Sequence, residues 1–342
     1  MRIWLYQDRT KSLVYQVLPA QYSDIAHRTI PIMTARDILY VRYALPDLVA
    51  AERFMTDFGL STVQRTDEVL RMRAAAAAPF VYEAVRGAEG RFLGVGFCVP
   101  EQKDLVRLAS FADAGPIEAL PSPFRGEYVR LTMPDGFQMD AVWSEEVYVA
   151  APVRAPNRFN AGHAKERTNA SIRQRREPAP ALRLGHVTLH VTDHAASVAW
   201  LRERFGLVPS DYFGPEPGRI EDVVGTFLRV DRGADFVDHH CLLVLQSRNA
   251  GIHHSSFELQ DLDHVMSAHD YLSLRGYRLD CGVGRHMLGS QIYDYWRDVH
   301  GFRVEHYTDG DVVNRDHVPS VFCGGADETT QWGMAPGAEF FE

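Results

Sequence analysis

The stretch Leu184-Gly-His-Val-Thr-Leu-His-Val191, followed by Asp193-His-Ala-Ala-Ser-Val-Ala-Trp-Leu-Arg-Glu-Arg-Phe-Gly-Leu207, decides the fold of this chain. The first segment alternates as a strand does, and the second reads as a helix that ends at a Phe-Gly stop signal. A similar pair occurs upstream, where Asp37-Ile-Leu-Tyr-Val-Arg-Tyr43 leads into a second helical segment, Pro46 to Leu60. The two pairs indicate a diverged internal repeat.

The later part of each half supports the repeat. Asp135-Gly-Phe-Gln-Met-Asp140 resembles His300-Gly-Phe-Arg-Val-Glu305, with an acid at the same offset from the glycine. Each half also contains a second helical segment, at about Gln102–Phe111 and about Asp261–Arg275, followed by short strand-like runs. One helix for several strands predicts the α+β class, with two domains built from β-α-β-β-β modules whose strands curl around a shared cavity.

Composition shifts suggest the domain limits. Residues 151–180 are rich in Pro, Arg, Asn and Ala, and they contain few large apolar residues, which is typical of an interdomain connection. We expect an N-terminal extension over 1–36, a first domain over 37–150, this linker over 151–180, a second domain over 181–310 and a tail over 311–342. The tail carries Trp332, Phe340 and Phe341, so we expect it to dock over the active site.

Overall composition excludes several classes of protein. The chain has 342 residues, a hydrophobic content of 46% and a net charge of −9, which argues for a globular protein and against a nucleic-acid surface. Its four cysteines form no Cys-x-x-Cys pair. The N-terminus reaches charged residues too early for a signal peptide, and no stretch approaches the length of a membrane helix. We therefore expect a cytoplasmic protein that acts on a small molecule.

Histidines and one acid are the candidate metal ligands. His186 lies in the middle of a predicted strand, and His253 and His254 are adjacent, so on a strand only one of them can face the cavity. Ser256 shares a face with His254 and leaves room for a ligand, which favours His254. A buried Glu305 would be costly without a cation beside it. Two imidazoles and one carboxylate leave open positions that suit a ferrous ion.

These motifs resemble the type I extradiol ring-cleavage dioxygenases, the catechol 2,3-dioxygenase group of the vicinal oxygen chelate superfamily. The matching elements, in order, are Leu-Gly-His186-Val, His240-Cys-Leu-Leu, His253-His254-Ser-Ser-Phe, Gly-Arg-His286, the strand with Tyr295, and Gly-Phe-Arg-Val-Glu305. His254 and His286 lie 32 residues apart, His286 and Tyr295 nine, and Tyr295 and Glu305 ten. The match covers residues 182 to about 310.

The resemblance implies roles for six residues. It implies that His186, His254 and Glu305 bind the metal, Fe(II) with Mn(II) as the alternative. It also implies that His286 and Tyr295 bind the substrate hydroxyls. His240, fourteen residues before His254, matches the family's acid/base better than His239, fifteen residues before it; both separations occur in the family, so the choice rests on the strand face and the flanking apolar run. Strand period alone does not choose between His239 and His240. Assemblies of identical subunits are common in the family, so we expect a homo-oligomer.

The first domain departs from the metal pattern. Leu39, Tyr40 or Val41 stands where the second domain has His186, and Gly94-Val-Gly-Phe97 stands where it has His254. Asp140 corresponds to Glu305, but a single carboxylate does not hold a divalent ion. We expect only the second domain to be catalytic.

The predicted function is cleavage of a catechol-type ring next to the diol, with both atoms of dioxygen entering the product. The alternatives are a glyoxalase-like metal-dependent isomerase or thiol transferase of the same superfamily, and a drug-sequestering binding protein. The loops Asp211–Arg219 and Gly282–Ser290 would shape the far wall of the pocket. Three arginines, Arg232, Arg285 and Arg297, are candidates for pairing with a substrate carboxylate.

Overall fold

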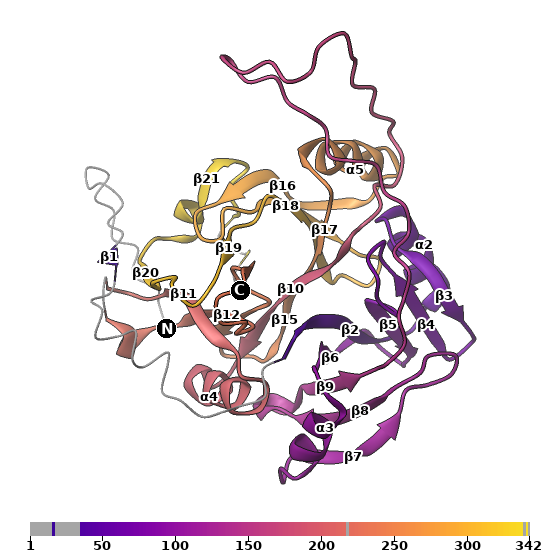
Figure 1. Ribbon diagram of the computed structural model, residues 1–342, viewed down its shortest axis with the longest axis vertical. Coiled ribbons are helices and arrows are strands. Elements are labelled where there is room, and N and C mark those ends of the chain that lie inside the picture. The colour runs from indigo at the N-terminus through magenta and orange to yellow at the C-terminus, as the bar shows by residue number, and fades with distance from the viewer. Residues whose placement is uncertain (1–15, 18–34, 217–218, 338–339, 341–342) are drawn as a thin grey trace.

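The computed structural model describes residues 16–17, 35–216, 219–337 and 340 (Figure 1). The expected N-terminal extension over 1–36 lies almost entirely outside the described residues, and so does Phe341 of the tail. Within the described part, two large sheets with few helices form the body of the molecule, which confirms the predicted α+β class.

The first sheet has eight strands in the order β3-β4-β5-β2-β6-β9-β8-β7. Its strands are β2 (Asp37–Leu45), β3 (Ser61–Arg65), β4 (Val69–Arg73), β5 (Tyr82–Arg86), β6 (Arg91–Cys98), β7 (Ala114–Ala119), β8 (Glu127–Thr132) and β9 (Gln138–Trp143). Its helices are α2 (Leu48–Asp57) and α3 (Gln102–Ala109), with a short 3-10 turn at Pro134–Gly136. At the centre, β2 is parallel to β5 and antiparallel to β6, and β6 is parallel to β9.

The second sheet has eleven strands in the order β1-β20-β11-β12-β14-β10-β15-β18-β17-β16-β21. Its strands are β1 (Gln16–Val17), β10 (Arg183–Val191), β11 (Val208–Phe213), β12 (Gly225–Arg229), β14 (Leu242–Gln246), β15 (Gly251–Glu258), β16 (Arg278–His286), β17 (Ile292–Arg297), β18 (Arg303–Thr308), β20 (Ser320–Phe322) and β21 (Thr330–Gly333). The remaining elements are α4 (His194–Phe205), α5 (Leu262–Leu274), 3-10 turns at Ile220–Asp222 and Ala326–Thr329, and a small ribbon of β13 (Val237–Asp238) and β19 (Val312–Val313).

The two sheets repeat one topology. The eight strands of the first sheet correspond, in order and direction at the centre, to β11-β12-β14-β10-β15-β18-β17-β16 of the second. Matching helices start in the same way, since the side chains of Asp47 and Asp193 each accept hydrogen bonds from the first turn of α2 and α4. Gly206, with a φ of 65°, ends α4 in the left-handed conformation predicted by the Phe-Gly signal. The predicted internal repeat is therefore present in the fold.

The C-terminal residues extend the second sheet at both edges. Strand β20 pairs with β11, and β21 pairs with β16, so residues after 311 reach opposite ends of the same sheet. These strands are only three and four residues long, which is why no period could be read from their sequence.

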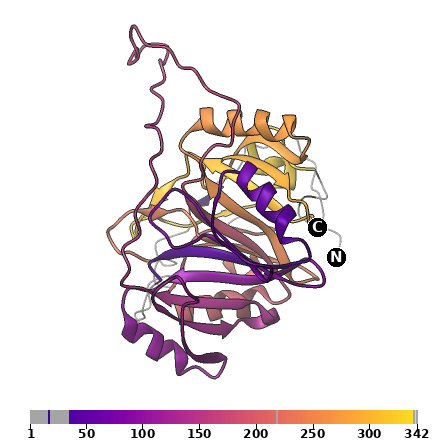
Figure 2. The ribbon, with the colours of Figure 1, turned by 90° about the vertical axis from the view of Figure 1, so that its right-hand side faces the viewer.

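The connection between the two sheets contains no helix or strand from residue 144 to 182. It forms the long excursion beside α5 in Figures 1 and 2. Two hydrogen bonds of 2.7 Å from Arg154 to the carboxylate of Asp261 fix it to the N-terminus of α5. Within the described residues, no helix has the length and the apolar run that crossing a bilayer requires.

The two sheets share one apolar core, which holds the second sheet in place. The ring of Phe58 stacks on the ring of His306 with centroids 3.7 Å apart, and it meets Phe257 edge-on. His306 Nε2 donates to the carbonyl of Phe58 at 2.7 Å. Because His306 directly follows Glu305, this contact supports the strand that carries the acid.

Replacing Phe58 with Ala should lower the free energy of unfolding by about 3 to 5 kcal/mol, because the side chain is fully buried between the two sheets. Denaturant unfolding followed by circular dichroism measures the change. Val106→Ala, at an exposed position of α3, is the control and should change stability by less than about 0.5 kcal/mol. Equal stability of the Phe58→Ala and parent chains would contradict the shared core.

Candidate metal and substrate site

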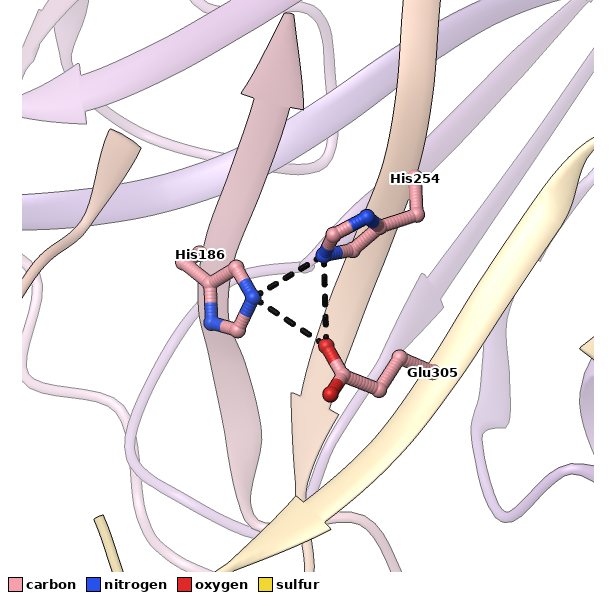
Figure 3. A group of neighbouring side chains, drawn as sticks. All are labelled: His186, His254 and Glu305. Atoms are coloured by element: carbon pink, nitrogen blue, oxygen red, sulfur yellow. Dashed lines mark hydrogen bonds and ion pairs between the residues drawn. The ribbon is translucent and has the colours of Figure 1, made fainter. Parts of the chain in front are cut away.

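Three neighbouring strands of the second sheet carry the predicted metal ligands. His186 on β10 lies opposite Ser256 on β15, and Ser256 lies beside Glu305 on β18. His254 is two residues before Ser256 and points to the same side (Figure 3). The small side chain of Ser256 leaves the space between the three larger ones free. The predicted residues therefore converge on one point.

The donor atoms form a nearly equilateral triangle. His186 Nε2 lies 3.1 Å from His254 Nε2 and 3.1 Å from Glu305 Oε2, and His254 Nε2 lies 3.3 Å from the same oxygen. Ligand atoms about 2.1 Å from an ion and at right angles to one another lie about 3.0 Å apart. The triangle therefore has the size of one face of an octahedral site, as in the two-histidine, one-carboxylate iron centres.

The buried carboxylate of Glu305 lacks a hydrogen-bond donor of good geometry among the described residues. Its side chain is 0% exposed, and neither carboxylate oxygen accepts a hydrogen bond. Burial alone would raise the pKa of Glu305, but its contacts with His186 and His254 hold that pKa well below the usual value, so the group is ionised. Burial lowers the pKa of His254 to about 4, which keeps this imidazole neutral and able to bind a metal. The residues present therefore fit a divalent cation.

A neighbouring histidine orients His254. His253 Nε2 lies 2.6 Å from the carbonyl of Phe340 and 2.7 Å from the guanidinium of Arg303, and these two contacts hold the ring in place. His253 Nδ1 lies 2.6 Å from His254 Nδ1, and this contact fixes the ring of His254 with its Nε2 atom at the triangle. The sequence-based expectation that His253 faces the packed outside is wrong, since His253 also lines the pocket. A register shift between β10 and β15 at this position breaks the alternation of faces.

His240 lies in the pocket beside the triangle. Its ring centroid is 4.4 Å from that of His186, and it lies at the pocket wall, whereas His239 does not. Burial, with the neighbouring imidazoles, lowers the pKa of His240 well below the usual value, so it is neutral in the pocket. Behind it, His239 contacts the carboxylate of Asp211, which was predicted only as the first residue of a pocket loop.

His286 and Tyr295 lie on the other side of the triangle. His286 Nε2 is 2.8 Å from the hydroxyl of Tyr295 and 3.8 Å from Glu305 Oε1. Tyr295 pairs with Glu305 across β17 and β18, so both side chains lie on the same face of the sheet. Burial, and then the charge of Glu305, raises the pKa of Tyr295 well above the usual value, which keeps it a hydrogen-bond donor. Tyr293 instead contacts Thr330 and the carbonyl of Met334 in the tail.

The tail supplies part of the pocket wall. Phe322, Thr329 and Phe340, all beyond residue 311, line the pocket together with the histidines. Trp332 is partly exposed and lies against Arg285 outside it.

The corresponding position in the first sheet is filled by a guanidinium. Tyr40 lies opposite Gly96, and Gly96 lies beside Asp140, so these residues match His186, Ser256 and Glu305. The ring of Tyr40 occupies the space over Gly96, where a Cβ atom would come within 2.4 Å of it. Asp140 accepts from Tyr40 at 2.9 Å and from Arg130 at 2.7 and 2.8 Å. A cationic side chain thus neutralises this acid, and the two histidines are missing.

Comparisons with known proteins agree with this geometry. Residues 183–306 match the model of the Glyoxalase/Bleomycin resistance protein/Dioxygenase superfamily. A curated relative, "Metapyrocatechase 2" from Cupriavidus necator, is 28% identical over 298 residues, which cover 85% of this chain and 87% of the relative. The resemblance predicted from the sequence is therefore confirmed.

Solved structures share the superfamily fold. A Mn(II)-bound glyoxalase from Novosphingobium aromaticivorans superposes with a TM-score of 0.75 at 21% identity, covering 90% of this chain and 94% of that one. The 2,3-dioxygenase LapB from Pseudomonas sp. KL28 gives 0.68 at 18% identity, covering 85% and 98%. Homoprotocatechuate 2,3-dioxygenase from Arthrobacter globiformis gives 0.66 at 16% identity, covering 85% and 86%. Of these three structures, the glyoxalase is described as Mn(II)-bound.

Replacing Glu305 with Ala should abolish tight metal binding, because the only anionic donor of the triangle is lost. Metal content after dialysis, measured by mass spectrometry, should fall from one ion per chain to less than a tenth. Glu258→Gln, which removes a carboxylate of β15 that pairs with Arg183 instead, is the control and should keep the full content. Two bound ions per parent chain would contradict the prediction that the first sheet binds no metal.

Proposed function

We propose that this protein is an extradiol dioxygenase, which opens the ring of a catechol-type substrate beside the diol and adds both atoms of dioxygen. One observation carries the proposal. The pocket joins the triangle of His186, His254 and Glu305 to three proton-handling side chains, His240, His286 and Tyr295. A metal-binding function alone needs the triangle but not this second set.

The proposed ligands are His186, His254 and Glu305, and the proposed ion is Fe(II), with Mn(II) as the alternative that the same donors accept. A bound ferrous ion would hold the diol and dioxygen side by side and pass electron density between them. The ligand set has one negative charge, so it leaves a net positive site that attracts a deprotonated diol. The first sheet domain is proposed to be non-catalytic, because its acid is already paired with Arg130.

The protein's own side chains handle the protons. His240 is neutral and buried at the pocket wall, so it can take a proton from one hydroxyl and return it later. Tyr295 and His286 form a hydrogen-bonded pair that can contact the other hydroxyl and steer the change from enol to ketone. Phe340 and the neighbouring rings keep bulk water away from these groups.

The named relatives support this proposal over its alternatives. The curated relative is called a metapyrocatechase, and two of the structural neighbours above are 2,3-dioxygenases. One neighbour is a glyoxalase, so a metal-dependent isomerase is the second candidate. Among the described residues that line the pocket there is no carboxylate to serve an isomerase as a second acidic ligand. The cytoplasmic location and the homo-oligomer expected from the sequence stay predictions.

With ferrous ion and catechol under air, the protein should consume one dioxygen per substrate and form a yellow ring-opened semialdehyde acid. An oxygen electrode and visible absorbance measure both. His240→Phe should keep its metal but lower kcat by about 100-fold or more, since it removes the proposed acid/base. His194→Asn is the control, because His194 is a buried histidine bonded to Thr226 away from the pocket, and it should keep parent rates.

Parent rates in the His240→Phe variant would refute the role of His240. Absence of oxygen uptake with every diol, together with metal-dependent turnover of a thiol adduct, would favour the isomerase.

A further inference from the structure

The pocket has one polar end and one apolar end. Beside His240, six apolar side chains line the pocket and form an apolar wall, and they come from β11, β12, β14, β20 and the turn after β16. The apolar wall consists of Phe213, Phe227, Leu243, Leu245, Leu288 and Phe322. The ring of Phe227 lies 4.9 Å from that of His240, so the wall begins directly beside the proposed acid/base.

No Lys or Arg lines the pocket among the described residues. The arginines that the sequence offered for a substrate carboxylate are engaged elsewhere. Arg285 binds Asp309 at 2.7 Å and the carbonyl of Ser290, and Arg297 binds Asp280 at 2.7 Å. Arg232 faces Asp235 at 3.7 Å. A carboxylate placed against the apolar wall would therefore be buried without a partner, at a large cost.

We infer that the substrate is a catechol with an uncharged apolar substituent, such as an alkyl or aryl group, which packs against the apolar wall. This inference rests on the proposed function. The diol occupies the polar end and fixes the ring, and the substituent points away from the histidines. Each buried methylene group then contributes about a fourfold gain in binding.

The test compares catechol, 3-propylcatechol and 2,3-dihydroxybenzoate with the ferrous full-length protein. Oxygen uptake gives kcat/KM, and anaerobic titration calorimetry gives the dissociation constant. We expect kcat/KM for 3-propylcatechol to exceed that for catechol at least tenfold and that for the benzoate at least 100-fold. Leu245→Arg, which adds a cation to the apolar wall, should lower the ratio of kcat/KM for 3-propylcatechol to that for the benzoate at least tenfold. Leu274→Arg, on the exposed side of α5, should leave it unchanged.

The two proposals fail in different ways. If no diol binds or consumes oxygen, the proposed function is wrong. If catechol is cleaved but the benzoate is bound and cleaved as well as 3-propylcatechol, only the inference about the apolar wall is overturned.

A second, independent observation concerns the side of His240 that faces away from the pocket. His240 Nδ1 lies 3.0 Å from His239 Nδ1, and His239 Nε2 lies 2.7 Å from Asp211 Oδ2. The other oxygen of Asp211 accepts from the backbone N–H of Ser320 at 2.6 Å and from its hydroxyl at 2.7 Å. All three side chains of this Asp211–His239–His240 chain are buried.

The donors and acceptors in this chain can be ordered in one direction. Asp211 only accepts, so His239 carries its hydrogen on Nε2 and offers a lone pair at Nδ1. His240 must then carry its hydrogen on Nδ1, and its Nε2 lone pair is left for the pocket. We propose that Asp211 and His239 are positioning residues that fix His240 as a base when the diol binds.

The substitution Asp211→Asn should reverse this order. The N–H of Ser320 requires an acceptor, so the amide oxygen of the new side chain stays there and its NH₂ group faces His239. That forces His239 to donate to His240, whose hydrogen then moves to Nε2. We expect kcat to fall by about 10- to 100-fold, with KM changed less than threefold and metal content unchanged.

Nitrogen-15 spectra of the histidines in the metal-free full-length chain should show His240 protonated on Nδ1 in the parent. In the Asp211→Asn variant they should show it protonated on Nε2. His239→Phe is a second variant that removes the acceptor and should give a similar loss of kcat. His317→Asn is the control, because His317 lies beside Asp211 but donates to the carbonyl of Ser210. Parent kcat in both variants, or an unchanged His240 spectrum in Asp211→Asn, would overturn the proposal.

Discussion

The structure depends on how the buried negative charge of Glu305 is neutralised. The carboxylate sits at the centre of the second sheet, is fully buried, and its contacts with His186 and His254 hold its pKa well below the usual value, so it is ionised. Placing such a charge in a protein interior is expensive unless a cation is near. A bound metal ion would supply that cation, and its open positions would supply the proposed chemistry. The three central strands, the small Ser256 between them and the packing of His306 on Phe58 all serve to keep this carboxylate where an ion can bind it.

The first sheet shows the other way to solve the same problem. Asp140 occupies the matching position, but the guanidinium of Arg130, on the strand that corresponds to the one carrying Tyr295, provides the positive charge. A guanidinium satisfies a carboxylate with directed hydrogen bonds and leaves no open coordination position. The same fold therefore gives one domain that is complete without a ligand and one that needs it.

Much of the fold and site could be predicted because they rest on local patterns. Two local signals identify the related sheets: the strand-to-helix pairs at Leu184 and Asp37, and the repeated Gly-Phe turns. Helices α3 and α5 begin and end within two residues of their predicted limits. His254 could be chosen from its small neighbour Ser256. The partners behind the site could not be found in this way. Asp211, Ser320 and the carbonyl of Phe340 come from distant segments, and no local period marks them. His253 was misplaced because a register shift in β15 is invisible in an alternating sequence.

Residues of the C-terminal tail contact the side chains behind two histidines of the pocket. The carbonyl of Phe340 orients His253, which orients His254, and Ser320 holds Asp211 behind His240. His254 and His240 thus take their direction from contacts with residues that lie far downstream of them in the sequence. The strands that carry or directly adjoin these imidazoles in the sequence all end by Thr308, so a chain shortened to that point would keep the strands but lose the contacts that align the two rings.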